Sequence, residues 1–462
     1  MSQVVLTDAL VVTMDADRAV ITDGYVWLED ERIRAVGSMT DLTAPVEVPR
    51  RSMKGFAVLP GLVNTHTHIS SFGLRGMQDQ GPQGYPGVKM YDGLRALDGE
   101  GGYLGSAAAL LEQLQGGITT VVAGEAGSDD CLAAAVRASC ESGARVIMSR
   151  ASMDSSVSVA ANLVIPEDLR EDPADSLAKL DWLRGTVTSD LVTVVPEAFS
   201  VMRVSREMML ALHGYAVEHG LPLLMHAGAT QNERNECLER TGMRIAHYLD
   251  DLEVLREGVL LGHGTWFDDA ESALIADRGA SVAHCPVANA WSGNRFSPLK
   301  EWLELGVRVG LGTDGATSNN SQDLFEAAKF AVFGQKIRLE DMSWGSPELA
   351  LELMTIKGAE AIGMADRIGS LEAGKLGDLV CIDLQRPSLA PITSVLSNLV
   401  YAHDRGAVRH VMVNGQFVVE DGVHRAFDAP ALVEGLNAWA EPALAASGLL
   451  GHFRSVSPFS FV

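Results

Sequence analysis

The sequence predicts an α/β fold, a (β/α)8 TIM barrel with a small β-sandwich domain that both chain ends form together. From about residue 60, apolar runs of strand length alternate with longer amphipathic stretches, as in GITTVVAG, LPLLMHAG and VRVGLGTDG. Such runs, followed by helices, are typical of a parallel sheet that is buried on both faces. About seven or eight of these units cover roughly 300 residues, and a TIM barrel typically takes ~250. No GxGxxG or GxxxxGK[ST] motif opens the first helix, where an open nucleotide-binding sheet would carry it.

The order of the units along the chain predicts four parts. Residues 1–58 are the first part of the β-sandwich, because short β-branched runs such as Tyr25–Leu28 alternate there with Asp and Gly. Residues 59–365 are the barrel. Strand-like runs return in residues 366–428 as GDLVCIDL, VRHVMVNG and QFVVEDG, and since neither end alone can bury a sheet face, the two ends are expected to pair. Residues 429–462 are predicted to form a C-terminal helix and a tail.

The charge of the chain narrows the classes of partner. Its 462 residues carry 36 Lys and Arg against 60 Asp and Glu, a formal net charge of −24. Such a chain repels phosphate backbones and anionic lipids, so we expect no nucleic-acid and no membrane partner. No apolar run is long enough to span a bilayer, the N-terminus lacks the basic region of a signal peptide, and the five cysteines form no CxxC pair. These features indicate a reduced, cytoplasmic protein, and we expect a homo-oligomer, a dimer or a tetramer.

Polar residues recur where the predicted barrel strands end. Chemistry in a TIM barrel takes place at this end of the strands. His at positions i and i+2 of a strand point to the same side, as a shared metal requires. Repetition of the same placement at five strand ends favours one common site over separate structural histidines. The residues concerned are His66 and His68, His226, His263, His284 and Asp314.

Four of these residues form a plausible set of metal ligands. His66, His68, His226 and Asp314 give three imidazoles and one carboxylate, which suits one divalent metal. Zn²⁺ is the first choice and Fe²⁺ the alternative. A metal in such a site lowers the pKa of its water towards ~7, so a metal-assisted hydrolysis is expected. Asp314 can then accept the proton of the water, while His263 polarises the group under attack.

Six motifs together resemble the amidohydrolase superfamily, in the branch of the chlorohydrolases and of guanine- and S-adenosylhomocysteine-type deaminases. They are PGLVNTHTH, MHAGATQNE, LGHGTWFDDAE, VAHCPVAN, GLGTDGATSNN and GSLEAGKLGDLVCIDL. The resemblance implies that His66, His68, His226 and Asp314 are the ligands of a mononuclear metal and that His263 is the catalytic histidine. It also implies a substrate-binding role for His284 and Asn289, which match the HxPxSN motif of that branch except that Ala288 replaces its Ser.

One residue departs from the pattern of that branch. A glutamate that relays protons is expected three residues after the third histidine, where this sequence has Ala229. Either Asp314 alone transfers the proton, or another acid takes over. Glu197, in VVPEAF at a predicted strand end, is our candidate for this catalytic role, with an exposed loop carboxylate as the competing interpretation. Glu233 and Gln231 are weaker candidates.

Three further residues are candidates for substrate binding. Arg75 and Gln78 follow the first histidine pair in a loop that resembles the first substrate loop of the family, and either side chain could meet a substrate carboxylate or ring amide. A loop that satisfies only its own backbone is the competing interpretation. Trp291 could stack on a planar ring, or it could pack against a neighbour.

Together these features predict a metal-dependent hydrolase. Its substrate is a planar nitrogen heterocycle or a cyclic amidine, attacked at a ring carbon by metal-activated water, with deamination or a related hydrolytic displacement as the result. Because Ala229 breaks the usual relay, hydrolytic removal of halide or sulfide, or opening of a ring amide, is the first alternative. A catalytically silent metal-binding barrel is the second alternative, and a lyase that uses the water only as a base is the third.

Overall fold

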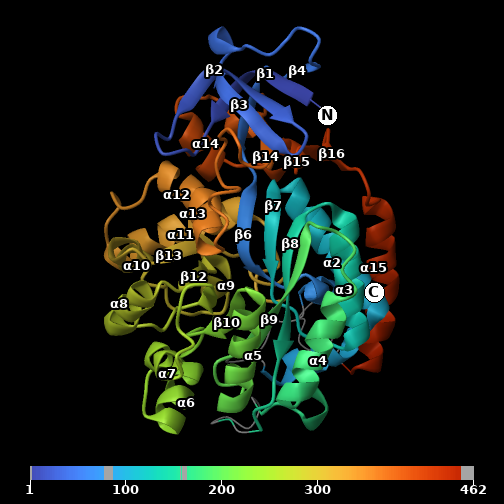
Figure 1. The fold of residues 1–462 in the computed structure, drawn as a ribbon, viewed down its shortest axis with the longest axis vertical. Helices are drawn as coiled ribbons and strands as arrows, with labels where there is room; N and C mark the ends of the chain where they lie inside the picture. The colour runs from blue at the N-terminus through green and yellow to red at the C-terminus, as the bar shows by residue number, and fades with distance from the viewer. Residues whose placement is uncertain (1–2, 77–86, 157, 159–163, 449–462) are drawn as a thin grey trace, which may run out of the picture.

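The computed structural model describes residues 3–76, 87–156, 158 and 164–448. Its centre is an eight-stranded sheet in which neighbouring strands are parallel and follow one another in chain order, as in a (β/α)8 barrel (Figure 1). The predicted barrel is therefore confirmed. The strands are β6 (Leu62–Thr67), β7 (Ile118–Ala123), β8 (Arg145–Ser152), β9 (Val192–Ser200), β10 (Leu223–Ala227), β11 (Val259–His263), β12 (Ser281–His284) and β13 (Arg308–Leu311).

A close seam joins the first and last strands of the barrel. The Thr65 hydroxyl donates to the Leu311 carbonyl at 2.9 Å, and the Asp314 N–H donates to the His66 carbonyl at 3.0 Å. Gly310 allows this approach, because a Cβ atom there would lie 2.3 Å from the Thr65 methyl group. The seam places the polar residues that follow β6 beside those that follow β13.

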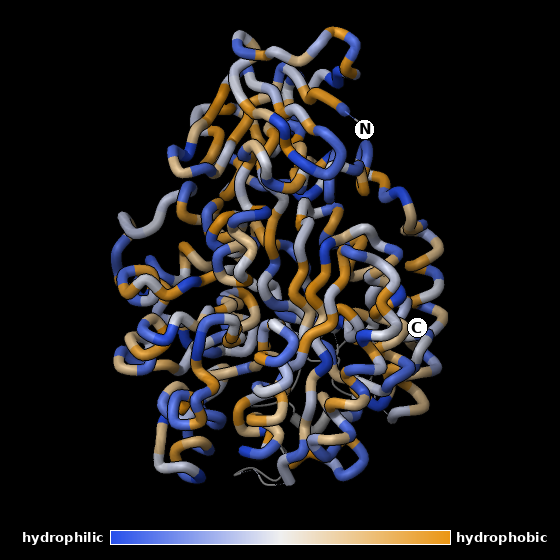
Figure 2. Tube along the Cα trace, in the orientation of Figure 1, coloured by the Kyte–Doolittle hydropathy of each residue, from blue (hydrophilic) through white to orange (hydrophobic). Residues whose placement is uncertain are grey.

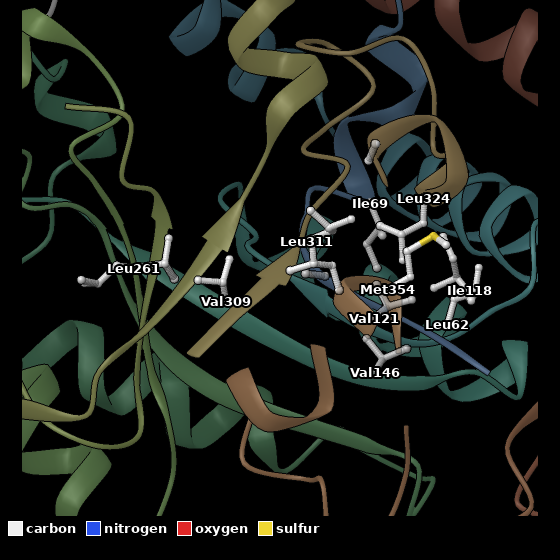
Figure 3. Packing of buried hydrophobic residues seen from close by; sticks show 14 of the residues in the cluster. Leu62, Ile69, Ile118, Val121, Val146, Leu261, Val309, Leu311, Leu324 and Met354 are labelled. Atoms are coloured by element: carbon white, nitrogen blue, oxygen red, sulfur yellow. The ribbon is translucent and has the colours of Figure 1, made fainter. Parts of the chain in front are cut away.

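The barrel strands bury both faces, which explains their continuous apolar sequences. Val121 and Leu261 pack in the large cluster between the sheet and the helices, whereas the adjacent Val122 and Leu260 belong to a second cluster. In Figure 3, strand residues such as Leu62 gather against residues of α11 and α12. Figure 2 shows the same arrangement as hydrophobic strands surrounded by helices of mixed hydropathy.

Helices follow the barrel strands along the chain and cover the sheet (Figure 1). Among the described residues, no helix is both long and apolar enough to cross a membrane. The helices up to the end of the barrel are α1 (Gly87–Ala96), α2 (Gly99–Gln115), α3 (Asp129–Ser142), α4 (Pro173–Arg184), α5 (Arg206–His219), α6 (Gln231–Thr241), α7 (Ile245–Asp251), α8 (Asp269–Arg278), α9 (Pro286–Trp291), α10 (Leu299–Leu305), α11 (Leu324–Leu339), α12 (Pro347–Met354) and α13 (Ile356–Ala361).

Both chain ends contribute to a second, nine-stranded sheet, as predicted. Its strand order is β17-β16-β15-β14-β5-β1-β2-β3, with β4 paired to β1. The two ends meet where β14 pairs antiparallel with β5, and Figure 1 shows them side by side above the barrel. The strands are β1 (Gln3–Val12), β2 (Val20–Glu29), β3 (Arg32–Ser38), β4 (Arg50–Ser52), β5 (Phe56–Pro60), β14 (Leu379–Asp383), β15 (Val408–Val413), β16 (Gln416–Glu420) and β17 (Val423–His424).

Two helices complete the C-terminal part of the chain, α14 (Val395–Tyr401) and α15 (Ala429–Ala446). Helix α15 lies along α2 at the side of the barrel (Figure 1). Trp439 anchors it, since its ring is buried and its Nε1 atom donates to Asp98 at 3.1 Å. Gly101 leaves room for that ring, because a Cβ atom there would lie 2.2 Å from it.

Candidate metal centre and active-site cavity

The carboxyl ends of the barrel strands bring the four predicted ligands together. His66 and His68 come from the end of β6, His226 from β10, and Asp314 from the segment after β13. The Nε2 atoms of His68 and His226 lie 3.3 Å apart, and Asp314 Oδ1 lies 3.2 Å from His68 Nε2 and 3.7 Å from His66 Nε2. The ligand atoms of His66, His68 and Asp314 lie within 4.8 Å of one another, as do those of His66, His226 and His263. This spacing suits one shared cation.

The imidazoles are prepared to act as ligands. The Nδ1 atoms of His68 and His226 bond to the carbonyl oxygens of Gly124 and Phe199, the latter at 2.6 Å. Since a carbonyl only accepts, each Nδ1 carries a proton, and His226 Nε2 presents a lone pair to the centre. Burial lowers the pKa of His68, but the hydrogen bond and charge of Asp314 outweigh burial and raise it to about 9, so a metal must displace the proton on His68 Nε2. Burial lowers the pKa of His226 to about 3 and the pKa of His66 well below its usual value. His66 Nε2 is buried and has no hydrogen-bond partner among the described residues, so the cluster fits a divalent metal.

Asp314 is held in an unusual backbone conformation. Its φ is +60°, in the left-handed region that non-glycine residues rarely adopt. Its carbonyl oxygen accepts hydrogen bonds from the hydroxyls of Thr67 at 3.0 Å and Thr313 at 3.1 Å and from the Gln322 amide at 3.1 Å. Burial raises the pKa of the Asp314 carboxyl, but the hydrogen bond and charge of the facing histidines outweigh burial and lower it well below its usual value. The carboxylate is therefore ionised and fixed in place.

His263 faces the same centre from the end of β11. Its Nε2 atom lies 3.8 Å from Asp314 Oδ2, and its Nδ1 atom lies 3.3 Å from Asn289 Oδ1. Burial lowers the pKa of His263, so the ring is neutral at physiological pH. The arrangement leaves Nε2 free to contact a group under attack.

A cavity of about 700 Å³ opens above this cluster. Such a volume suits a small organic ligand, which typically occupies a pocket of ~300–1,000 Å³. Besides His68, His226, His263 and Asp314, its described lining includes Glu125, Glu197, Phe199, Arg203, Glu233, Trp266, Asn289 and Asn294.

Glu197, the proposed substitute for the missing glutamate, lies next to the histidine cluster. It is 1% exposed, accepts a hydrogen bond from the Ser149 hydroxyl, and places Oε1 3.5 Å from His226 Nδ1. Burial raises its pKa to about 7. Gly124 makes room for it, because a Cβ atom there would lie 3.0 Å from Glu197 Oε2.

Glu233 lies beside the position where the glutamate is missing. Its carboxylate accepts from the Ala229 N–H at 3.0 Å and from the Ser200 hydroxyl at 2.8 Å. Burial raises its pKa to about 7 as well. The weaker candidate Gln231 begins α6 and is exposed, although it too lines the cavity.

The other predicted substrate residues lie in different surroundings. Within the described part of the chain, His284, Arg75 and Trp291 are not among the residues that line the cavity. His284 is buried, with its ring edge-on to Trp302 at a centroid distance of 6.0 Å. Arg75 pairs with Glu112 and stacks on the Phe72 ring, and half-buried Trp291 ends α9. Gln78 lies outside the described residues.

Trp266 and Glu125 are two of the cavity residues that the sequence analysis missed. Trp266, rather than Trp291, places an aromatic ring in the cavity lining. The sequence feature that could have predicted this is its position three residues after His263, in LGHGTWFDD. Glu125 follows β7 and accepts hydrogen bonds from the N–H groups of Ile69 and Ser70 at 2.5 and 3.1 Å. In the sequence, Glu125 follows another apolar run, in VVAGEAG, and a carboxylate at a strand end indicates a site residue as well as a histidine does.

Known proteins are similar to this chain over nearly its whole length. A 5-methylthioadenosine/S-adenosylhomocysteine deaminase of Thermodesulfovibrio yellowstonii is 29% identical over 443 residues, which cover 93% of this chain and 96% of the relative. A deaminase of the same name from Nitratidesulfovibrio vulgaris is 31% identical over 438 residues, covering 93% of this chain and 95% of the relative.

Solved structures agree with the fold. An adenosine deaminase from Xanthomonas campestris with bound zinc superposes with a TM-score of 0.87 at 26% identity, covering 96% of this chain and 99% of that one. Atrazine chlorohydrolase from Arthrobacter aurescens TC1, complexed with zinc, gives a TM-score of 0.85 at 22% identity, with coverage of 95% and 100%, and shows likeness of fold. The model of the amidohydrolase family matches residues 57–418. The chain therefore belongs to the amidohydrolase family, and the prediction of a hydrolase that acts on carbon–nitrogen bonds other than peptide bonds is confirmed.

Proposed function

We propose that this protein hydrolyses a planar nitrogen heterocycle or a cyclic amidine at a ring carbon and releases ammonia or an amine. The observation that carries the proposal is the convergence of three histidines and Asp314 at the cavity, with His263 beside them. The relatives named as deaminases support an amino leaving group. We also propose that the protein acts as a homo-oligomer, a dimer or a tetramer, in the cytoplasm.

Zn²⁺ is the metal we propose for the cluster, with Fe²⁺ as the alternative. Three imidazoles and one carboxylate suit either ion, and the similar adenosine deaminase structure holds zinc. A divalent metal in this site supplies a water whose pKa is lowered towards ~7. Asp314 would accept a proton at this site, and His263, whose Nε2 atom carries a lone pair, would accept a hydrogen bond from an N–H group of the ring edge and so orient the ring.

Glu197 is the acid that we propose for protonating the ring or the leaving group. Its pKa of about 7 allows it to exchange a proton at neutral pH, as a general acid or base must. Its carboxylate accepts from the Ser149 hydroxyl and lies beside His226, whereas the Glu233 carboxylate accepts from both the Ala229 N–H and the Ser200 hydroxyl. Glu197 is therefore the stronger candidate, and Glu233 is the competitor that the experiment must separate from it.

A second reaction is favoured by Ala229 itself. Halide and thiolate leave as stable anions and need less protonation than an amine does. A site without the usual glutamate tolerates such leaving groups better. Hydrolytic removal of halide or sulfide is accordingly the alternative activity.

The test is an assay of the zinc-loaded protein on purine, pyrimidine and triazine rings that differ only in the group displaced: amino, chloro or methylthio. We expect turnover of at least one amino ring, with Asp314→Asn abolishing it. Glu197→Gln should slow amino substrates more than chloro substrates, while Glu233→Gln should slow neither selectively. Turnover confined to chloro or methylthio rings supports the alternative activity. A metal-loaded protein inactive on the whole panel would support the silent-barrel interpretation.

A further inference from the structure

Three buried carboxylates line the cavity in addition to Asp314. Glu125 follows β7, Glu197 belongs to β9, and Glu233 lies in the first turn of α6. Their exposed fractions are 1%, 1% and 6%. We propose that this acidic part of the wall, Glu125, Glu197 and Glu233, selects substrates that present a cationic or N–H-rich edge and rejects anionic ones. The inference rests on the proposed function, since it names the substrate class of the same site.

Among the described residues that line the cavity, no Lys or Arg side chain is free to bind an anionic substrate. Arg203 is the one Lys or Arg among the described residues that line the cavity. Its guanidinium pairs with Glu236 at 2.6 and 3.4 Å, and the two residues are 7% and 0% exposed. Because breaking a buried ion pair costs free energy, Arg203 remains paired with Glu236 and does not bind a ligand.

The three carboxylates, in contrast, have no cationic partner of their own. None of them forms an ion pair with Lys or Arg within the described ranges. Glu125 accepts from the backbone at Ile69 and Ser70 and from the Ser70 hydroxyl, and Glu233 accepts from Ala229 and Ser200. Since an ionised carboxylate has about four acceptor positions, lone pairs remain for the N–H groups of a ligand.

Burial without a cation is unfavourable for these groups. It raises the pKa of Glu125, and it raises the pKa of Glu233 to about 7. A bound amidinium or a row of ring N–H groups relieves this cost, whereas a bound anion adds to it. A divalent ion at the histidine cluster is partly offset by Asp314, and a cation bound beside the three further carboxylates favours their ionised forms. The formal net charge of −24 also attracts cations to the protein as a whole.

Neutral groups of the cavity wall complement this acidic part. Trp266, Asn289 and Asn294 follow β11 and β12 and line the cavity there. The Trp266 Nε1 atom donates to Asn294 Oδ1 at 2.8 Å, which fixes both side chains. An aromatic ring and neutral amides suit the flat body of a heterocycle, while the acidic part takes its nitrogen-bearing edge.

The experiment compares three planar probes of the same size on the zinc-loaded protein by calorimetry or ligand-observed NMR. The probes are benzamidine, which is a cation, benzamide, which is neutral, and benzenesulfonate, which is an anion. We expect benzamidine to bind about tenfold more tightly than benzamide, and benzenesulfonate to bind most weakly. Glu125→Gln and Glu233→Gln should each lower the ratio of benzamidine to benzamide affinity several-fold. Glu239→Gln removes the same charge from an exposed position of α6 and should leave the ratio unchanged.

Several results would overturn the inference. One is that benzamide or benzenesulfonate binds as tightly as benzamidine, and another is that benzamidine does not bind detectably. A third is that the ratio of benzamidine to benzamide affinity is unchanged in both Gln variants when they are folded and zinc-loaded. The wild-type comparison needs no variant, so a variant that fails to fold leaves the test intact. If the protein prefers the cationic probe but hydrolyses no ring, only the proposed function is contradicted. If it hydrolyses a ring but shows no charge preference, only this inference is contradicted.

Discussion

The Nδ1 atom of His263 lies 3.3 Å from the side-chain oxygen of Asn289, a residue of α9, the helix that follows β12. Because an amide oxygen only accepts, this contact keeps the proton on Nδ1 and leaves Nε2 bare, 3.8 Å from Asp314. Asn289 is itself held, since its amide nitrogen lies 3.3 Å from the Ser297 hydroxyl. Asn289 is thus placed to set the tautomer of His263.

Removal of that amide should slow the reaction without weakening substrate binding. We expect Asn289→Ala to lower kcat by about 10- to 100-fold, as loss of a group that orients an essential histidine typically does, with KM changed little. The double variant with His263→Ala should be no slower than His263→Ala alone, because Asn289 acts through His263. An increase in KM at constant kcat would instead show that Asn289 contacts the substrate.

The Gln322 side chain should control metal affinity although it is not a ligand. Its amide donates to the Asp314 carbonyl and so supports the left-handed backbone that aims the carboxylate at the cluster. Gln322→Leu is expected to weaken zinc binding by about 10- to 100-fold, measured by competition with a chromophoric chelator. Thr355→Val is the matched control, because it removes another fully buried polar group, the hydroxyl bonded to the Leu351 carbonyl. Equal zinc affinity in Gln322→Leu and wild type would contradict this role.

The parts of the site that the sequence predicted share one property: their position follows from strand periodicity. His66 and His68 alternate on a strand, and His226, His263 and Asp314 each end an apolar run, so the topology alone brings them together. The pairing of the two chain ends was predictable for a similar reason, since each lacked the strands to bury a face.

Loop residues were harder to predict, because their partners lie far away in the sequence. Arg75 pairs with Glu112 from α2, and neither periodicity nor spacing indicates that contact. Trp266 and Trp291 both follow strand-end histidine motifs, yet only Trp266 is among the described residues that line the cavity. Which of two tryptophans faces a cavity depends on how each loop turns, and composition does not record it.

Restoring the missing acid should change the balance between leaving groups. The Ala229 residue lines the cavity, so Ala229→Glu adds a carboxyl group to the site. We expect Ala229→Glu to raise kcat/KM for amino rings relative to chloro rings, because only the amine needs protonation to leave. Ala229→Gln supplies the same bulk without the acid and should not change the ratio. A uniform loss on both substrates with Glu but not with Gln would exclude a relay at this position.

Burial of Glu233 should make stability depend on pH. Its pKa is raised from 4.5 to about 7, so the folded state binds this proton more tightly than the unfolded state does. The corresponding stability is fully present below pH ~4.5 and is lost as pH rises through about 7, with a total near 3 kcal/mol. Glu233→Gln should remove this part of the pH dependence of the free energy of unfolding.

Denaturant unfolding of the zinc-loaded protein at several pH values between 5 and 8 measures this effect. The difference between wild type and Glu233→Gln isolates one carboxyl group, because Glu197 and the metal cluster titrate in both proteins. Relative to wild type, Glu233→Gln should gain stability as the pH rises, since a neutral amide costs less to bury than an ionised carboxylate. Glu239→Gln, exposed on the same helix, should follow the wild-type curve. A constant difference across this range would mean that Glu233 keeps the same protonation state in the folded and unfolded chains.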